Sequence, residues 1–314
     1  MKNLFSALDL KKTNAHSITW TEMLRPCVMF ITITAILWLT FIYNASAQDN
    51  QKPILSNKVT PLRLGLLPHW SSDLLLKRYR NLIVYLEKKL QRPVLVHTAP
   101  NFKTYIKRAA QGRYDLYLTA PHLAAYHESQ NQHHRIARFK KSFHTVIAVE
   151  EYSPYEKLDD LRGKFITAPD LLAAGTLQGE VAFIKNGFNL TKDISIKYTP
   201  SHNNALYSLA NKKSDAAIAG IPAFKIVSKA TKLKKPLRIL TRTPSIPHMM
   251  FMSPAHIPQE QIIKYQNALL SIHNDETGKA FLESVPFGTH GLTEITDKDM
   301  RDLSDFVRLL KQRL

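Results

Sequence analysis

Cysteine is almost absent from this sequence. The only one, Cys27, lies in an apolar segment near the N-terminus. The chain after that segment therefore has no disulfide bond and no thiol chemistry. This excludes a small disulfide-stapled domain and a cysteine nucleophile.

The sequence also lacks the patterns that mark nucleic-acid binding. It has no zinc-finger spacing, no aromatic–basic RNA-binding signature and no low-complexity segment. The 43 Lys and Arg residues outnumber the 25 Asp and Glu residues and give a formal net charge of +18, but they are scattered along the chain. We interpret this charge as a solvated basic surface that can steer small anionic ligands, and we expect no nucleic-acid partner.

Long apolar runs are rare as well. One run, residues 28–42, follows Arg25 and precedes the small residues Ala45 and Ala47. A basic flank, a short apolar core and an A-x-A-like site are typical of a cleavable signal peptide, here residues 1–47. The alternative is an uncleaved membrane anchor, although a run of about 15 residues is shorter than the roughly 20 that span a bilayer.

Either interpretation places the rest of the chain outside the cytoplasmic membrane, and we expect a periplasmic protein. Export counts against an enzyme that needs ATP or NAD(P), and we expect no cofactor. Residues 48–60 are polar and are predicted to form a linker.

After the linker, strand patterns alternate with helix patterns. Apolar strands are predicted at residues 62–67, 94–97 and 114–118, and amphipathic helices at 74–90 and 102–111. This alternation predicts an α/β fold with a mainly parallel sheet.

The pattern repeats about 100 residues later. Asp115 and Asp215 each open a short apolar strand that ends in a small residue and a proline, and two further strands end at Pro68 and Pro169. Two pairs at one spacing predict two lobes of similar build. The predicted parts are lobe 1 over residues 61–149, lobe 2 over 150–243, and a return to lobe 1 over 244–314. Two strands that cross between the lobes form a hinge that can close on a ligand.

These segments, in this order, resemble the phosphate/phosphite/phosphonate-type periplasmic substrate-binding proteins of ABC transporters. The resemblance spans residues 61–300 and is carried by LRLGLLP at 62–68, the run 81–126, EKLDDLRGKF within 156–188, and the run from SIPHMMFM at 245–252. It implies a two-lobed type II binding protein, a monomer and not an enzyme, that delivers a small oxyanion to a membrane permease. The alternative is a ligand-sensing subunit that docks on a membrane receptor such as a histidine kinase.

Two departures from the family pattern concern the ligand. The resemblance implies Ser or Thr donors at the start of the second-lobe helix, where this chain has Ala173 and Ala174. It also implies a Gly-Pro-x-Ser-Tyr loop, where this chain has Ala-Pro-His-Leu-Ala at residues 120–124. The sequence therefore leaves the ligand open, and we expect weak oxyanion binding or a larger, less charged ligand.

The candidate binding residues lie where strands turn into helices. In an open α/β sheet the ligand lies beyond the carboxyl ends of the strands, at helix N-termini whose first amides are unpaired. Proline suits the first turn of such a helix. The candidates are Pro68, His69, Trp70, Thr119, Ala120, Pro121, His122, Ala174, Gly175, Thr176, His202 and Asn203. His69 and His122 would add switchable donors, and Trp70 and Tyr126 flat apolar walls.

Two rival interpretations have little support. The histidines that include His133 and His134 do not show a recognised metal-ligand spacing, so we expect no metal site. His69 is followed by Ser71, Ser72 and an aspartate, residue types that a hydrolase uses for nucleophilic catalysis. The chain has no G-x-S-x-G nucleophile elbow, however, and a serine here is better explained as a helix N-cap.

Overall fold

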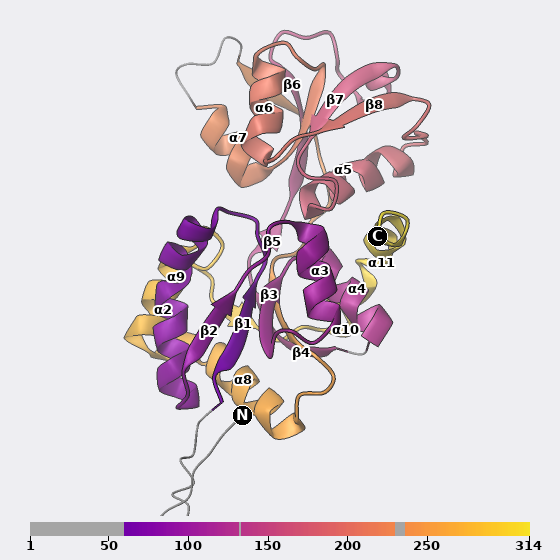
Figure 1. Ribbon diagram of the computed structural model, residues 1–314. Helices are drawn as coiled ribbons and strands as arrows, with labels where there is room; N and C mark the ends of the chain where they lie inside the picture. The colour runs from indigo at the N-terminus through magenta and orange to yellow at the C-terminus, as the bar shows by residue number, and fades with distance from the viewer. Residues whose placement is uncertain (1–59, 132, 230–235) are drawn as a thin grey trace, which may run out of the picture. The chain divides into compact units, whose positions relative to one another are not determined.

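The computed structural model describes residues 60–131, 133–229 and 236–314 (Figure 1). The predicted signal peptide and all but the last residue of the predicted linker lie outside these ranges. Sheets of six and five strands, each flanked by helices, form the two lobes. The predicted α/β fold with two lobes is confirmed.

Lobe 1 is built on the six-stranded sheet, whose order is β13–β4–β12–β3–β1–β2. β1, β2 and β3 are parallel, while β12 runs antiparallel to β3. The strands are β1 (Leu62–Leu66), β2 (Val94–His97), β3 (Leu116–Thr119), β4 (His134–Phe139), β12 (Met250–Ser253) and β13 (Leu292–Thr293). The helices are α2 (Ser72–Leu90), α3 (Phe102–Ala110), α4 (Pro121–Asn131), α8 (Gln259–Leu270), α9 (Glu276–Ser284), α10 (Asp297–Arg301) and α11 (Ser304–Lys311), with a 3-10 turn, η3 (Ile272–Asn274).

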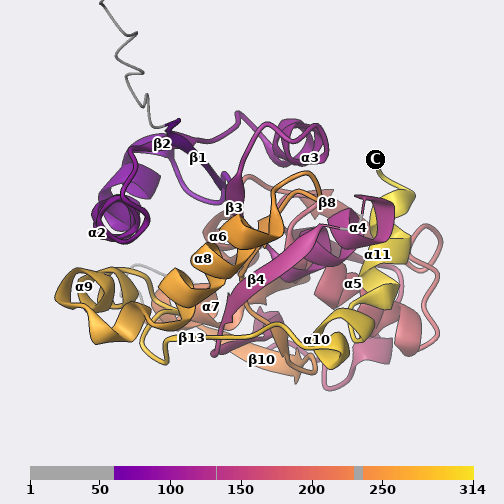
Figure 2. The ribbon, with the colours of Figure 1, turned by 90° about the horizontal axis from the view of Figure 1, so that it is seen from below.

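Helical spacing of apolar residues positions α2 on this sheet. Leu75, Tyr79, Leu82 and Leu86 fall on one face of the helix and are all buried. α9 packs beside α2 (Figures 1 and 2), with the rings of Tyr79 and Phe281 5.7 Å apart. The return segment thus completes the core of lobe 1.

Lobe 2 is built on the five-stranded sheet, whose order is β10–β6–β9–β7–β8. β7, β8 and β9 are parallel, and β6 runs antiparallel to both of its neighbours, β9 and β10. The strands are β6 (Thr145–Glu150), β7 (Lys164–Ala168), β8 (Ile194–Tyr198), β9 (Ala216–Gly220) and β10 (Leu237–Arg242). The helices are α5 (Ala174–Lys185), α6 (His202–Ala210) and α7 (Ile221–Val227), with a 3-10 turn, η2 (Leu158–Leu161).

The chain crosses between the lobes twice. β5 (Ser142–Phe143) pairs with β11 (Ile246–Pro247) as an antiparallel ribbon, and beside it Thr145 and Thr243 exchange hydrogen bonds. This is the predicted two-strand hinge. The first crossing lies at residues 143–145, earlier than the boundary expected near residue 149, because β6 pairs with β9 and β10 in lobe 2. β6 is apolar on both faces, so its pattern did not indicate which sheet it joins.

The internal repeat extends to individual hydrogen bonds. The Asp115 carboxylate accepts the Arg63 N–H at 2.8 Å, and the Asp215 carboxylate accepts the Phe165 N–H at 2.9 Å. Each aspartate also donates its own N–H to the carbonyl of that same residue, at 2.8 Å in both lobes. The two aspartates therefore join the parallel strands of their lobes in the same way.

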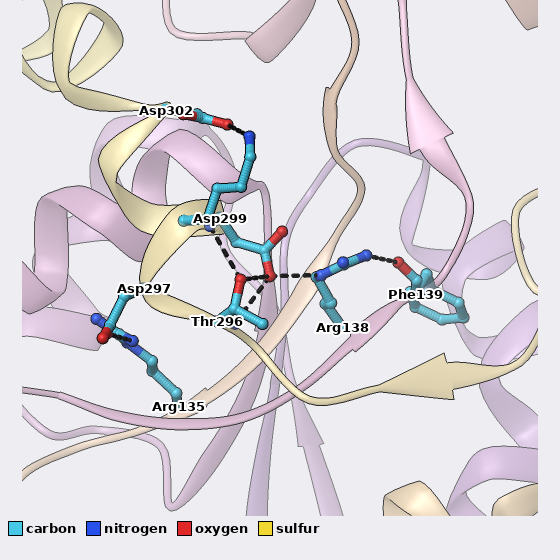
Figure 3. Close-up of polar contacts among 8 residues, drawn as sticks. Arg135, Arg138, Phe139, Thr296, Asp297, Asp299 and Asp302 are labelled. Atoms are coloured by element: carbon cyan, nitrogen blue, oxygen red, sulfur yellow. Dashed lines mark hydrogen bonds and ion pairs between the residues drawn. The ribbon is translucent and has the colours of Figure 1, made fainter.

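The C-terminal region contains two short helices, α10 and α11, separated by residues 302–303. Asp299 in α10 accepts hydrogen bonds from the Thr296 N–H and hydroxyl at 2.8 and 2.9 Å, and it pairs with Arg138 of β4 at 2.8 Å (Figure 3). Burial would raise the pKa of Asp299, but these partners hold it below its usual range. α10 is thereby fastened to the sheet of lobe 1.

α11 contacts both α4 of lobe 1 and α5 of lobe 2 (Figure 1). Among the described residues, no helix has both the length and the apolar character needed to cross a membrane.

Candidate ligand-binding site between the lobes

The N-terminus of α5 carries free backbone donors. Within the described residues, no group accepts a hydrogen bond from the N–H of Ala174, Gly175 or Thr176. The N-cap residue, Ala173, has no side-chain acceptor that could satisfy them. Three aligned amides at the start of a 12-residue helix, with the positive end of its dipole, form a site suited to an anion.

His202 lies directly against this helix N-terminus. A Cβ atom added at Gly175 would lie 2.6 Å from His202 Cε1 and 3.5 Å from Thr145 Oγ1. Only a glycine at position 175 therefore lets the imidazole and the threonine hydroxyl approach α5 this closely. Three parts of the fold therefore meet at Gly175: the first turn of α5, the first residue of α6 and the hinge.

The tautomer of His202 follows from its partner. Its Nδ1 accepts the Gly220 N–H at 3.0 Å, so the proton of the neutral ring is on Nε2. Burial, with a smaller effect from His69, lowers the pKa of His202 to about 4. His202 is therefore a neutral ring that offers Nε2–H as a donor.

Further buried polar atoms near the lobe interface have no hydrogen-bond partner among the described residues. They are His69 Nε2, Thr119 Oγ1, His122 Nδ1, Thr145 Oγ1, Thr176 Oγ1 and Gln178 Oε1. Leaving one such atom unpaired costs about 1–3 kcal/mol. A group of unpaired, buried polar atoms where two lobes meet is typical of a binding site, because a bound molecule can supply the missing hydrogen bonds.

His69 and His248 are also neutral. His69 Nδ1 lies 2.9 Å from the Leu67 carbonyl and donates to it, which leaves Nε2 as an acceptor. Burial lowers the pKa of His69 to about 4 and that of His248 to about 3, and His69 adds to the effect at His248. The interface therefore combines neutral donors with neutral acceptors, among them His69 Nε2, His122 Nδ1 and Gln178 Oε1.

His122 joins the lobes directly. It is fully buried in the first turn of α4, and its Nε2 donates to the Leu172 carbonyl of lobe 2 at 2.9 Å. Burial lowers its pKa to about 4. Pro121 and the buried Ala120 form the corner that positions it, with Thr119 at the end of β3.

The other predicted residues differ in where their side chains lie. Pro68 and His69 follow β1, as expected, but Trp70 packs within lobe 1, 6.3 Å from the rings of both Tyr79 and Phe287. Asn203, which follows His202 in α6, is exposed. The corner at the start of α7 has its first amides occupied, because Gly220 donates to His202 and Ile221 to the His144 carbonyl.

Sequence reasoning missed Thr145 and Gln178. Thr145 is the first residue of β6, which runs antiparallel to β9. It therefore lies opposite Gly220, at the carboxyl end of β9. That position could have been inferred had β6 been assigned to lobe 2. Gln178 is a buried polar residue one turn into α5 whose Nε2 donates to the Pro244 carbonyl of the second crossing strand, and no local pattern indicates this contact.

Across the described ranges, no group of three or more His, Cys, Asp or Glu side chains could hold a metal ion.

Two α/β lobes, a two-strand hinge and helix N-termini at the hinge define a type II periplasmic binding protein. The family model described as "ABC transporter, phosphonate, periplasmic substrate-binding protein" matches residues 64–300, and the chain belongs to this family. Its members are substrate-binding components of transporters and not enzymes. The match favours transport over the alternative of a sensing subunit.

Solved structures share the fold at low sequence identity. XAC2383 from Xanthomonas citri bound to ATP has a TM-score of 0.69 and 17% identity, covering 80% of this chain and 97% of its own. PhnD1 from Prochlorococcus marinus in complex with methylphosphonate has a TM-score of 0.68 and 16% identity, covering 80% and 98%. A binding-protein component of a phosphonate transporter from Pseudomonas aeruginosa has a TM-score of 0.66 and 17% identity, covering 79% and 87%. No curated protein matches the sequence.

Proposed function

We propose that the chain binds a small phosphonate-type oxyanion at the N-terminus of α5 and delivers it to the permease of an ABC transporter. The observation that carries this proposal is the convergence of donors around Gly175. Three free amides, the hydroxyls of Thr145 and Thr176, and the Nε2–H of His202 meet there.

Neutral donors and a helix dipole suit this ligand class. A phosphonate oxygen that leaves water needs a hydrogen-bond donor, and each unmet oxygen costs about 1–3 kcal/mol. The cluster around Gly175 offers six donors without a cationic side chain. His69 Nε2, a neutral acceptor near this cluster, suits an oxyanion that keeps one proton.

Phe143 supplies an apolar neighbour for a substituent on phosphorus. Its ring edge would lie 3.1 Å from a Cβ atom at Gly220, which would itself lie 3.7 Å from His202 Cε1. A methyl group or a hydrogen on phosphorus can face this ring, whereas a fourth oxygen would face it without a donor. We therefore propose phosphite and methylphosphonate as better ligands than phosphate.

The experiment is isothermal titration of the wild type and the Thr176→Val variant with methylphosphonate. Valine keeps the shape but removes a buried hydroxyl that has no partner among the described residues, so the ligand-free protein should gain stability while affinity falls about tenfold. Thr167→Val is the matched control, because the Thr167 hydroxyl already donates to the Ala205 carbonyl at 3.0 Å. It should lose stability and keep affinity. Equal affinities in all three proteins would contradict the proposed site.

We further propose that residues 1–47 are removed on export and that the remaining chain is a monomer. N-terminal sequencing of protein recovered from the periplasm should begin at Gln48. Light scattering on a sizing column should give the mass of one chain. Recovery only in the membrane fraction with an intact N-terminus would favour the anchor.

A further inference from the structure

A surface pocket of about 550 Å³ lies on lobe 1, between α3 and the edge formed by β1 and β2. Four cationic side chains line it: Arg63, Lys107, Arg108 and Arg113. Of the described residues, no carboxylate lines it. This pocket shares no residue with the cluster around Gly175.

The pocket has a buried tyrosine hydroxyl beside its cationic groups. Tyr114 lies against Gly65, where an added Cβ atom would be 2.6 Å from the tyrosine ring. Tyr114 is 1% exposed, and its hydroxyl lies near the Arg108 guanidinium. Burial raises the pKa of this hydroxyl, with Arg108 opposing, so it is a neutral donor at neutral pH.

Most of the positive charge at the pocket is uncompensated. Arg63 pairs with Asp115, and Arg108 donates to the Thr98 carbonyl at 2.6 Å, which is a neutral acceptor. Lys107 and Arg113 are exposed and make no ion pair in the part of the chain that the structure describes. Three cationic groups thus converge on one concave surface without a carboxylate.

The repeat supplies an internal comparison. Lobe 2 has a pocket of about 510 Å³ at the equivalent place, beside Asp215 and the end of α6. There Lys212 and Lys213 are accompanied by the carboxylates of Glu150 and Asp215. The fold therefore produces a pocket in each lobe, but only the pocket of lobe 1 is strongly basic.

We propose that the lobe 1 pocket is a second anion site, for a phosphate-bearing ligand with more than one negative charge. Guanidinium and ammonium groups bind such anions through charge-assisted hydrogen bonds, and the pocket volume is in the range of small-ligand sites. The ligand is either a soluble oligophosphate or the headgroup of an anionic phospholipid. Both present the same phosphate chemistry to Lys107, Arg108 and Arg113.

The test uses pyrophosphate and the purified protein, titrated in the presence of saturating methylphosphonate. We expect about one pyrophosphate per chain, with an affinity that falls as salt is raised. The double variant Lys107→Ala/Arg113→Ala should lose about tenfold or more in pyrophosphate affinity, since two charge-assisted contacts are removed. Its methylphosphonate affinity should stay unchanged, which separates this site from the one at α5.

The matched control is Lys212→Ala/Lys213→Ala, which removes the same charge from the lobe 2 pocket and should leave pyrophosphate binding within about twofold. A parallel arm measures retention on vesicles of phosphatidylglycerol against vesicles of phosphatidylcholine. Retention only on phosphatidylglycerol, lost in the lobe 1 variant alone, would assign the site to a lipid headgroup. The proposal is overturned if neither probe binds, or if the two double variants behave alike.

Discussion

Arg313, near the end of the chain, pairs with Glu180 in the middle of α5. Glu180 is fully buried, and burial raises its pKa while Arg313 and the Tyr198 hydroxyl oppose that shift. Arg313 also donates to the Leu171 carbonyl at 2.7 Å. Because α11 packs on both α4 of lobe 1 and α5 of lobe 2, the C-terminal segment links the two lobes.

Replacing Arg313 by alanine should therefore destabilise the protein by about 3 kcal/mol, because it leaves a buried carboxylate without its cation. Urea unfolding measures this loss. Arg308→Ala, which removes an exposed partner of Asp305, is the control and should change stability by less than about 0.5 kcal/mol. Adding Glu180→Gln to the Arg313 variant should recover part of the loss. An unaltered midpoint in Arg313→Ala would show that the pair does not stabilise the fold.

Gly175→Ala should weaken methylphosphonate binding by about tenfold or more. The added methyl group would lie 2.6 Å from His202 Cε1, so the imidazole must move away from the α5 amides. The loss should not add to that of His202→Ala, because both changes remove the same contact. Full additivity in the double variant would mean that Gly175 and His202 do not act at one site.

Ala174→Ser should tighten oxyanion binding by about tenfold, since it returns a hydroxyl donor to the first turn of α5. Ala182→Ser, two turns further along the same helix, is the control for any general effect of serine. If both variants bind as the wild type does, the first turn of α5 does not contact the ligand.

Acid should destabilise the protein through its buried histidines. His127 is fully buried, neither ring nitrogen has a partner among the described residues, and burial followed by the neighbouring His133 lowers its pKa from 6.5 to about 3. The unfolded chain therefore binds more protons than the folded one between pH 6.5 and 3. Stability contributed by the neutral ring is lost as pH falls through this window, by about 2 kcal/mol between pH 7 and 5.

His127→Leu removes both the unpaired nitrogens and this proton uptake. Its melting temperature should exceed that of the wild type at pH 7 and by a larger margin at pH 5, as followed by circular dichroism. The exposed His290→Gln is the control and should track the wild type. A variant less stable than the wild type at pH 5 would contradict this account of His127.

The sequence predicted features that depend on local pattern. Asp115 and Asp215 repeat with their strands, and each takes the same hydrogen-bonding role. The corner at Pro121 was located because a proline ends its strand, and the start of α5 was located by the family resemblance and the proline at position 169. Local pattern also indicated α2, whose buried face follows the helical period.

Features that depend on distant contacts could not be predicted. β4 reads His-Arg-Ile-Ala-Arg-Phe, a basic segment that becomes a strand because it pairs with β12 and β13. The position of Trp70 against Phe287 and the link from Arg313 to Glu180 join residues more than 100 positions apart. Nothing in the neighbouring residues encodes such contacts, so the composition of the site was only partly foreseeable.

A crystal structure of the protein grown with methylphosphonate tests the central claim most directly. We predict phosphonate oxygens at hydrogen-bonding distance, about 2.7–3.2 Å, from the N–H groups of Gly175 and Thr176 and from His202 Nε2. A methylphosphonate bound elsewhere in the molecule, with these donors at more than hydrogen-bonding distance, would contradict the claim.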